Sequence, residues 1–584
     1  MSEWILLQKP GDYRQIGERH HISPVLARLL RNRGIQSDEE IENYLHGGRE
    51  GLHEPEKMKD MEKCAALLRK AVDEGKRIRV IGDYDVDGVC SSAILLRGLR
   101  AMGADADAMI PHRIRDGYGM NLSMIEQAAS DGVEVILTCD NGISAREEAK
   151  RAAELGIMLL ITDHHEVPFE ERDGQKHYLL PEAPAIVDPK QEDCSYPYPG
   201  ICGAAIAFKL VCCMFEGQLS SEMEDELIQL AAFATVCDVM ELQDENRILV
   251  REGLHLMKER PAKGIRELLR ALEMEGAELN SHHLGFILGP CVNATGRLDS
   301  AMRALKLFVT EDTEEALAIA AELIELNTRR KDMTERAARE ASEQIEAGEH
   351  DGGPVYVIYL PDCHESIAGI VAGRIRESYG HPTLILTDAE EGLKGSGRSV
   401  EAYHMFEALS RVADLFTRFG GHAQAAGFSL PAENLTELRR RLNEDCSLTE
   451  EDLREKIYVD MELPFRYVTG ALVDQLALME PVGNGNEKAI LGRQGLKLKY
   501  IRPIGDSEKL CLLSVEDEGQ RFELKLFFRT EEIRSYIRSE YGEGVLKQLL
   551  EGRGEGVDFA VLYSAQWNEY RGEKNLQLVV EDYQ

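Results

Sequence analysis

The stretch VIGDYDVDGVCSS, residues 80–92, places three aspartates directly after a short apolar run. Asp83, Asp85 and Asp87 alternate at the point where the chain leaves the run that ends at Ile81. Carboxylates this close together repel one another unless a positive charge lies among them. The stretch therefore predicts a buried strand that ends at a cation-binding site.

The same pattern continues along residues 76–166, where apolar strands alternate with helical segments. The predicted strands are KRIRVIGDYD, ADAMIPH, VEVILTCDNG and IMLLITDHHE. The segments CSSAILLRGLRAMG, NLSMIEQAASDG and SAREEAKRAAELG lie between them and have the pattern of helices. Strands that are apolar throughout and separated by helices are typical of a parallel sheet with both faces covered. The sequence thus predicts an α/β fold built on a parallel sheet.

Acidic and histidine residues follow several of these strands. Asp140 follows VEVILTC, and Asp163, His164 and His165 follow IMLLIT. Asp238 follows AAFATVC, an apolar run of either helical or strand character. Ligands of parallel sheets bind at the carboxyl ends of the strands, so these side chains are expected to converge.

The chemistry of these side chains indicates a site for two divalent ions. Oxygen ligands with one or two imidazoles suit Mn²⁺ or Mg²⁺ better than they suit zinc. Asp140 is the expected shared ligand, because its strand should lie between the others. The candidates for this site are Asp83, Asp85, Asp87, Asp140, His164, His165 and Asp238. The neighbouring Cys90, Cys139 and Cys237 are expected to be small buried hydrophobes.

Each of these signals has a simpler structural explanation when it is taken alone. A D-x-D pair at a strand end often caps a helix, an Asp before Gly usually forms a turn, and a His-His pair is more often structural. Three such signals at the ends of neighbouring parallel strands favour a metal site.

Length and composition limit the number of domains and indicate the cellular compartment. A chain of 584 residues exceeds one hydrophobic core, so roughly three or four domains are expected. The 104 acidic and 68 basic residues give a net charge of −36, which weakly disfavours a nucleic-acid binder but is compatible with a local basic groove. Cysteines without a C-x-x-C pair indicate reduced thiols in a cytoplasmic protein. The sequence predicts neither a secretory signal nor a membrane span.

The second half of the chain predicts a connector helix and two further domains. Residues 312–347 contain neither Gly nor Pro, so one long helix is expected from a cap at Asp312 to Gly348. A second α/β unit follows, with GPVYVIYL and HPTLILTD as strands around the helix ESIAGIVAGRIRESYG. From about residue 460, short alternating strands indicate a small barrel or sandwich. The expected divisions are 1–50 (no assigned role), 51–310 (catalytic), 311–348 (connector helix), 349–450 (second α/β domain) and 455–584 (β-rich domain).

Several of these motifs resemble a known family. GDYDVDG, CDNGIS, TDHHE and TVCDVM resemble the four motifs of the DHH phosphoesterase superfamily, and KGSGRS and FGGHAQAAG resemble its companion DHHA1 domain. With CVNATGRLDSA and LMEPVGNGNE, the set is similar to the superfamily members that degrade single-stranded DNA from the 5′ end. The resemblance runs from about residue 75 to the C-terminus. It implies a DHH domain, a DHHA1 domain and a C-terminal OB-like domain.

The resemblance also implies roles for individual residues. The metal ligands that it implies are Asp83, Asp85, Asp87, Asp140, His164 and Asp238. The catalytic positions that it implies are His165, Arg297 and His422. The substrate-binding positions that it implies are Arg113, Tyr118, Ser396, Arg398, Gly420 and Gly421. Among these, Arg113, Ser396 and Arg398 are expected to hold a 5′-phosphate, because arginine offers paired donors to phosphate oxygens.

One segment departs from the family pattern. DCHESIAGIVAGR, residues 362–374, has no Trp before His364 and no Pro-Gly after it, where the family typically has both. His364 and Arg374 are retained, so the departure concerns the shape of the loop.

The function that the resemblance implies is metal-dependent hydrolysis of single-stranded DNA from the 5′ end to mononucleotides, in DNA repair and recombination. The expected partners are single-stranded DNA, a single-strand-binding protein and a helicase, with no membrane, and the chain is expected to be a monomer. The OB-like domain is expected to offer aromatic side chains on which bases stack. The candidates are Phe527, Phe528, Trp567 and Tyr570.

Two other functions fit part of the sequence. An oligoribonuclease or cyclic-dinucleotide phosphodiesterase of the same superfamily would share the metal motifs but would not need residues 460–584. A non-catalytic replication scaffold would keep the fold and lose the metal carboxylates, all of which are present here.

Overall fold

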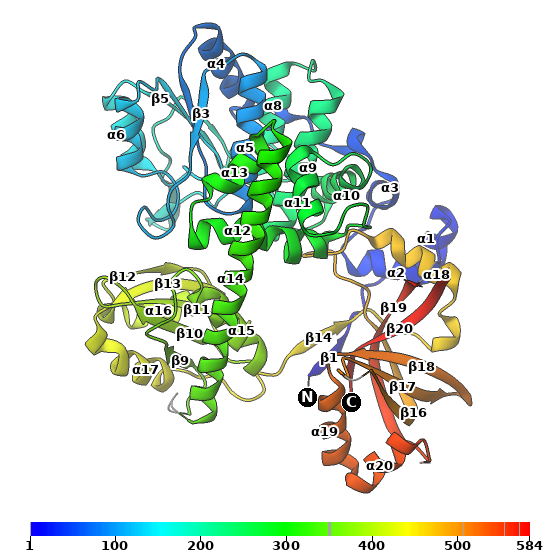
Figure 1. The fold of residues 1–584 in the computed structure, drawn as a ribbon. Helices are drawn as coiled ribbons and strands as arrows, with labels where there is room; N and C mark the ends of the chain where they lie inside the picture. The colour runs from blue at the N-terminus through cyan, green and yellow to red at the C-terminus, as the bar shows by residue number, and fades with distance from the viewer. Residues whose placement is uncertain (1, 349–351, 506, 554, 571–572) are drawn as a thin grey trace. The chain divides into compact units, whose positions relative to one another are not determined.

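The computed structural model describes residues 2–348, 352–505, 507–553, 555–570 and 573–584 (Figure 1). The chain forms two compact units. Residues Arg49–Arg454 form one unit, and Met1–Gly48 together with Glu455–Gln584 form the other. Among the described residues, no helix is long and apolar enough to cross a membrane.

The larger unit contains the predicted parallel sheet. Its strands, in spatial order, are β3 (Ala106–Met109), β2 (Ile78–Ile81), β4 (Val135–Thr138), β5 (Met158–Thr162) and β8 (Ala185–Val187). All four neighbouring pairs are parallel. The expectation that the strand before Asp140 lies between the others is confirmed, because β4 lies between β2 and β5.

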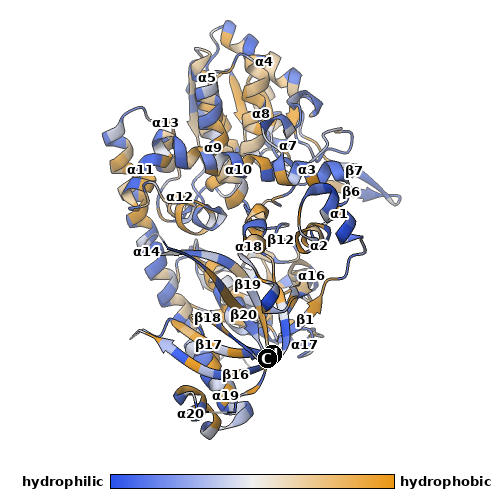
Figure 2. Cartoon of the chain, turned by 90° about the vertical axis from the view of Figure 1, so that its right-hand side faces the viewer, coloured by the Kyte–Doolittle hydropathy of each residue, from blue (hydrophilic) through white to orange (hydrophobic). Residues whose placement is uncertain are grey.

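Helices cover both faces of this sheet, which explains why its strands are apolar throughout. One face packs against α4 (Met61–Asp73), α5 (Val86–Ala101) and α8 (Gly203–Phe215). The other face packs against α6 (Leu122–Ser130) and α7 (Arg146–Glu154). Figure 2 shows the strands beside α5 and α8 in the orange of apolar residues. An exposed hairpin of β6 (Phe169–Arg172) and β7 (Gln175–Tyr178) projects from this domain.

A layer of helices extends the first core. It consists of α9 (Ser221–Cys237), α10 (Asp244–Glu259), α11 (Lys263–Ala271), a π-helical turn (His283–Leu288), α12 (Gly289–Leu298) and α13 (Met302–Val309). Buried residues of these helices belong to the same hydrophobic cluster as α5 and α8. The apolar run before Asp238 is therefore a helix, and Asp238 lies at its C-terminus.

The predicted connector helix is confirmed as α14 (Thr313–Glu346). The Asp312 side chain caps it by accepting hydrogen bonds from the backbone N–H groups of Glu314 and Glu315. Its N-terminal turns pack into the first core, and its C-terminal turns pack against the second sheet. Figure 1 shows the helix running from α11–α13 to β9 and α15.

The second sheet of the larger unit is mixed. Its strands, in spatial order, are β12 (Arg418–Gly421), β13 (Ala425–Leu430), β11 (Leu393–Arg398), β10 (Thr383–Asp388) and β9 (Tyr356–Tyr359). Only β9 and β10 pair in parallel. One face packs against α14 and α15 (Ala368–Tyr379), and the other against α16 (Met405–Arg411) and α17 (Leu435–Glu444).

The glycine-rich segments of this sheet had no predicted structure, and they form strands β11, β12 and β13. Glycine weakens a strand in isolation, which hides it from a propensity argument. Packing explains Gly395, because a Cβ there would lie 2.2 Å from the ring of Phe428. The glycine leaves the space that this aromatic ring fills.

The smaller unit contains the predicted barrel. Its strands, in spatial order, are β15 (Met461–Glu462), β16 (Leu491–Ile504), β17 (Leu510–Asp517), β18 (Gln520–Phe527), β20 (Glu573–Tyr583) and β19 (Val557–Tyr570). An additional pairing between β16 and β19 closes the sheet. The strand-rich pattern did not reveal two helices between β18 and β19, α19 (Thr530–Tyr541) and α20 (Glu543–Glu551). They bury Ile533, Ile537, Leu546 and Leu549 in the barrel core.

The N-terminal residues belong to this smaller unit. They form β1 (Glu3–Leu6), α1 (Tyr13–His20), α2 (Pro24–Asn32) and α3 (Asp38–His46). Strand β1 pairs in parallel with β14 (Lys456–Val459), which precedes the barrel. The three helices share a hydrophobic cluster with Met479 and Ala489, next to α18 (Gly470–Leu476). The segment is thus part of the unit that carries the barrel.

Candidate metal centre

The three aspartates of GDYDVDG lie on a tight turn between β2 and α5. The Asp85 carboxylate caps α5 by accepting from the backbone N–H groups of Asp87 at 3.0 Å and Gly88 at 3.1 Å. Glycine is required at position 88, because a Cβ there would lie 2.4 Å from backbone atoms of Asp83. The aspartates therefore alternate along a turn and the first helical turn, not along a strand.

Neighbouring elements fix the other two carboxylates of this turn. Asp87 accepts from the N–H groups of Gly203 and Ala204, at 2.7 Å each, where α8 begins. Asp83 accepts from the N–H of Gly119 at 3.3 Å, and its buried Oδ2 has no partner among the described residues. Each carboxylate thus has a fixed position and keeps oxygen lone pairs for a cation.

His164 joins the ends of the other elements to this turn. Its Nε2 lies 3.0 Å from Oδ1 of Asp140 and 3.6 Å from Oδ2 of Asp87. The same nitrogen lies 3.7 Å from Oδ2 of Asp238, at the C-terminus of α9. The buried Nδ1 has no partner among the described residues. His164 therefore directs one nitrogen at three carboxylates from three elements.

The ligand atoms gather into three overlapping groups. In each group the atoms lie within 4.8 Å of one another. The groups are Asp83–Asp85–Asp140, Asp87–His164–Asp238 and Asp140–His164–His165. Asp140 belongs to two of them, as expected for a residue whose strand lies between the others. All six residues predicted to bind metal are brought together.

Burial and mutual repulsion raise the pKa values of this cluster. Burial, then the charge of Asp85, raises the pKa of Asp83 well above its usual value. The pKa of Asp140 is raised in the same way by burial and by Asp87. The pKa of Asp238 rises to about 8, again chiefly through burial. A set of buried carboxylates that repel one another is stabilised by cations.

The donor set fits two Mn²⁺ or Mg²⁺ ions. Both metals prefer carboxylate oxygens, and Mn²⁺ also accepts imidazole. The unpartnered Oδ2 of Asp83 provides a buried lone pair for such an ion. The thiols of Cys90, Cys139 and Cys237 are disfavoured as ligands, because burial raises the pKa of each.

His165 lies beside the cluster and is oriented by Asp163, to which sequence analysis assigned no role. Its Nδ1 lies 2.7 Å from Oδ1 of Asp163, and the hydroxyl of Tyr118 lies 3.2 Å from its ring nitrogens. Burial opposes protonation of His165, but the hydrogen bond with Asp163 raises its pKa to about 9. Tyr118 also donates to the carbonyl of Asp140 at 2.8 Å. An acid directly before two histidines was the sequence signal for this arrangement.

Arginines surround the cluster without carboxylate partners among the described residues. The Arg113 guanidinium lies 4.6 Å from the ring centroid of Tyr84, inside GDYDVDG. Arg297 donates to the carbonyl of Ser366 at 2.7 Å, and burial lowers its pKa to about 9. Burial also lowers the pKa of Arg398, and Arg113 contributes to that effect. Arg113 and Arg398 are thus close enough to repel each other, as expected of two residues that share an anion.

The predicted positions on the second sheet lie in different environments. Ser396 and Arg398 lie on β11 against α15, where a Cβ at Gly369 would be 2.8 Å from Oγ of Ser396 and 3.1 Å from Nη2 of Arg398. Gly420 and Gly421 end the edge strand β12, and the exposed His422 follows them. No recorded contact joins the described side chain of His422 to the metal cluster, so its role stays a prediction.

The segment that departs from the family pattern, residues 362–374, forms a short loop and the first turns of α15. Nδ1 of His364 lies 2.7 Å from the hydroxyl of Ser366. The carbonyl of the same Ser366 accepts from Arg297. The retained histidine therefore orders the loop that holds Arg297.

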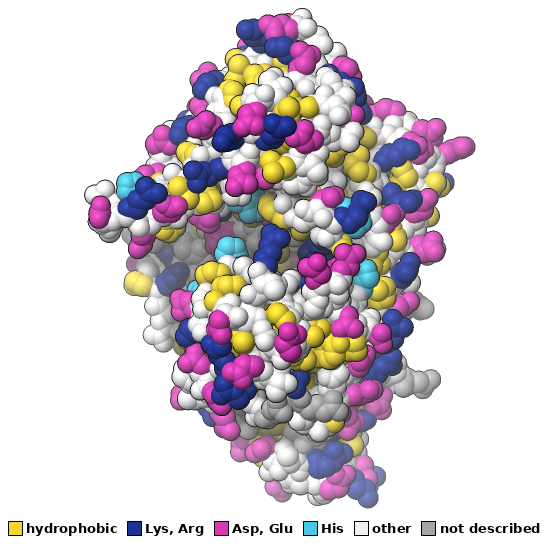
Figure 3. All heavy atoms as spheres, turned by 90° about the vertical axis from the view of Figure 1, so that its left-hand side faces the viewer, with side chains coloured by type: hydrophobic (Ala, Val, Ile, Leu, Met, Phe, Trp, Pro, Cys, Tyr) yellow, Lys and Arg dark blue, Asp and Glu magenta, His cyan; other side chains and the backbone are white. Residues whose placement is uncertain are grey.

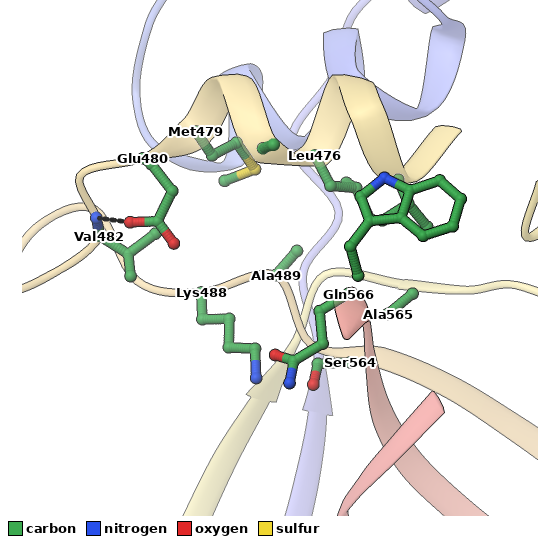
Figure 4. Close-up of a pocket in the computed structure, with 12 residues that line it drawn as sticks. Leu476, Met479, Glu480, Val482, Lys488, Ala489, Ser564, Ala565 and Gln566 are labelled. Atoms are coloured by element: carbon green, nitrogen blue, oxygen red, sulfur yellow. Dashed lines mark hydrogen bonds between the residues drawn. The ribbon is translucent and has the colours of Figure 1, made fainter. Parts of the chain in front are cut away.

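In the barrel unit, two of the candidate aromatics have clear environments. Phe528 is 76% exposed at the end of β18. Trp567 donates to Asp474 at 2.8 Å, carries the Lys574 ammonium 4.6 Å from its ring centroid, and lines a cavity of about 170 Å³. Figure 4 shows Leu476 and Met479 on one side of this cavity and Ala489, Ser564 and Gln566 on the other. Phe527 is half-buried, and the side chain of Tyr570 lies outside the described residues.

Comparison with known families matches three parts of this chain. Residues 77–235 match the DHH family N-terminal domain, 352–447 the DHHA1 domain and 459–582 the RecJ OB domain. The chain is 33% identical to the single-stranded-DNA-specific exonuclease RecJ of Bacillus subtilis over 582 residues, which cover 99% of this chain and 70% of that relative. The chain belongs to the RecJ family.

Solved RecJ structures have the same fold. The crystal structure of RecJ from Thermus thermophilus in complex with Mn²⁺ matches with a TM-score of 0.79 at 26% identity, covering 100% of this chain and 79% of that chain. The Mg²⁺ complex of RecJ from the same organism matches with a TM-score of 0.75 at 26% identity, covering 100% and 78%. The RecJ family thus has all three domains that the motifs implied.

Proposed function

We propose that this protein is a metal-dependent exonuclease that hydrolyses single-stranded DNA from the 5′ end to mononucleotides, in DNA repair and recombination. The observation that carries the proposal is the convergence of three overlapping ligand groups on Asp140 and His164. The cluster retains every carboxylate that a non-catalytic scaffold would lose. The RecJ-type barrel at residues 459–582 favours this function over that of a small-substrate phosphodiesterase.

The metal ligands in this proposal are Asp83, Asp85, Asp87, Asp140, His164 and Asp238, which would hold two Mn²⁺ or Mg²⁺ ions. When bound, such ions supply positive charge to phosphoryl oxygens and lower the pKa of an attacking water. His165, oriented by Asp163 and Tyr118, would lie beside the reacting phosphate. Arg297 of α12, anchored on Ser366, and His422 of the DHHA1 domain would stabilise the charge on the phosphate.

The 5′-phosphate accounts for the direction of digestion. Arg113, Ser396 and Arg398 would bind this terminal phosphate, with the backbones of Gly420 and Gly421 nearby. The mutual repulsion of Arg113 and Arg398 supports this assignment. A 5′-end fixed at this point would place the first linkage at the metal centre, so mononucleotides leave one at a time.

The proposal extends to the cellular setting. Acidic and basic side chains are interspersed over the face shown in Figure 3, so attraction for DNA would depend on local arginines. A monomer that receives single strands from a helicase and a single-strand-binding protein fits this activity. The free cysteines support a cytoplasmic location.

The test is digestion of single strands labelled at either end, with Mn²⁺ present. We expect immediate release of a 5′ label as a mononucleotide and late release of a 3′ label. Asp140→Asn should lower the rate at least 100-fold. Asp173→Asn, the same change at an exposed hairpin position, is the matched control and should cleave like the wild type. Early loss of the 3′ label, or full activity of Asp140→Asn, would contradict the proposal.

A further inference from the structure

The face of α14 that packs against the two hydrophobic cores is apolar at both ends and polar in the middle. Its N-terminal turns contribute to the core of the DHH domain through Ala316, Ile319, Ala320 and Leu323. Its C-terminal turns contribute to the core beside the second sheet through Ala337, Ala341 and Ile345. Between these apolar stretches, the same face carries Asn327, Arg330 and Thr334 at helical spacing. The helix therefore presents a polar interval between two cores.

The side chain of Arg330 is held in place within this interval. Its Nε donates to Oδ1 of Asn327 at 3.1 Å. Asn327 is buried, and its Nδ2 lies 3.4 Å from Sγ of Cys291 on α12. The terminal guanidinium nitrogens of Arg330 have no hydrogen-bond partner among the described residues. The hydrogen bond from Nε thus orients the half-buried guanidinium of Arg330. Its two terminal nitrogens remain available as paired donors to an external acceptor.

The charges around Arg330 are positive. Burial lowers its pKa, and the neighbouring Arg374 of α15 adds to this effect. Arg330 in turn lowers the pKa of Arg297 on α12. No carboxylate pairs with Arg330 in the part of the chain that the structure describes. An oriented, half-buried cation among other cations is unfavourable unless an anion joins it.

This group of charges differs from the one assigned to the 5′-phosphate. The charges of Arg113 and Arg376 lower the pKa of Arg398. The charge that lowers the pKa of Arg330 is that of Arg374. The pKa of Arg297 is lowered by arginines of both groups, namely Arg113 and Arg398 of the first and Arg330 of the second. Arg297 therefore lies between two cationic positions, of which the 5′-phosphate pocket uses one.

We propose that Arg330, oriented by Asn327, binds a backbone phosphate of the DNA strand at a subsite separate from the 5′-phosphate pocket. Arg330 is a positioning residue in this scheme, since it holds the strand on the far side of Arg297. The inference rests on the proposed function, because it takes single-stranded DNA as the ligand.

The test measures binding in place of cleavage. Full-length protein with Mn²⁺ is titrated with a fluorescent single strand whose linkages are phosphorothioate and resist hydrolysis. Fluorescence anisotropy gives the affinity at a series of salt concentrations. Each phosphate contact on a single strand contributes about 0.7 to the slope of log K against log salt. We expect Arg330→Gln to bind more weakly and to lower the slope by about 0.7.

Two further variants separate phosphate binding from a structural role. Arg329→Gln removes the same charge from the exposed side of the same helix and should keep the wild-type slope. Arg330→Lys keeps the charge without the paired donors, and its affinity for the strand should lie between those of the wild type and Arg330→Gln. Without DNA, Arg330→Gln should melt at or above the wild-type temperature, because a repelled cation is removed.

The inference is overturned if Arg330→Gln keeps the wild-type slope, or if Arg329→Gln lowers it equally. A lower melting temperature with an unchanged slope would assign Arg330 a structural role. Failure of the proposed function would be seen separately, because the wild-type protein would then release no 5′-terminal nucleotides.

Discussion

Oδ1 of Asp140 lies 3.0 Å from Nε2 of His164, across two adjacent parallel strands. Asp140 adopts a left-handed backbone conformation, with φ of 60°, two residues after the end of β4. A non-glycine residue in this region is strained, and such strain is found where a functional site requires it. The conformation turns the Asp140 carboxylate toward His164 and toward the turn that carries Asp83 and Asp85. These two residues thus link the two halves of the candidate metal centre.

Metal binding should stabilise the larger unit. A ligand that binds only the folded state at 100 times its Kd stabilises by about 2.7 kcal/mol. We expect Mn²⁺ to raise the melting temperature of the wild-type protein and to leave that of Asp140→Asn almost unchanged. Differential scanning calorimetry with Mn²⁺ or with a chelator measures both. An equal rise in Asp140→Asn would show that Mn²⁺ binds elsewhere, and Asp173→Asn is the control for the loss of a carboxylate.

Gly296 should be essential because of its close approach to the metal-binding turn. A Cβ at this position would lie 2.3 Å from the carbonyl oxygen of Tyr84. Gly296→Ala should therefore move α12 away from the turn, displace Arg297, and destabilise the protein by about 1–3 kcal/mol. Cleavage should fall at least tenfold at a temperature where the variant is folded.

Gly285→Ala is the matched control for this prediction. A Cβ at Gly285 would meet Val236 at 3.6 Å, an ordinary contact distance. Steady-state cleavage of a short single strand measures both variants. Wild-type kcat/KM in Gly296→Ala would show that α12 can shift without disturbing the site.

The parts of the fold that could be predicted follow from local patterns. Apolar runs predicted β2, β4 and β5, and the absence of Gly and Pro predicted α14. The metal cluster was predictable because parallel strands bring their carboxyl ends to one edge. Asp140 could be placed at its centre from strand order alone.

The remaining features depend on contacts between distant segments. The N–H groups that hold Asp87 come from Gly203 and Ala204, more than a hundred residues later in the chain. Strand β11 contains Gly395, which leaves space for the ring of Phe428 although glycine does not favour strands. Arg330 could not be distinguished from Arg329 by residue type. Its position on the inner face became clear only from the burial of Asn327 and Thr334.

A buried ion pair should secure the N-terminal helices on the barrel unit. Arg33 of the α2 C-terminus makes a two-pronged ion pair with Asp460, whose side chain is 3% exposed. Asn32 also donates to Oδ1 of Asp460 at 3.0 Å. Arg33→Met leaves the Asp460 charge buried with fewer donors, which costs about 3–5 kcal/mol.

Urea denaturation followed by tryptophan fluorescence measures this loss. Trp4 and Trp567, both in the smaller unit, report on its unfolding. Arg14→Met, at an exposed position of α1, is the control and should change stability by less than about 0.5 kcal/mol. Equal stability of the two variants would mean that the ion pair does not secure this segment.

His20 should make the stability of the smaller unit dependent on pH. The buried ring lies between Glu42 and Asp38, with Nε2 2.9 Å from Oδ1 of Asp38. The hydrogen bond with Glu42 raises the pKa of His20 above 6.5, although burial opposes it, and Asp38 adds to the rise. Because the folded state binds the proton more tightly, this stabilisation is fully present below pH 6.5 and is lost as the pH rises through the folded pKa. We expect NMR titration to give His20 a pKa above 6.5, and His20→Asn to flatten the fall in stability across this range. His21→Asn, at the exposed neighbouring position, should keep the wild-type pH profile, and a wild-type profile in His20→Asn would contradict the assignment.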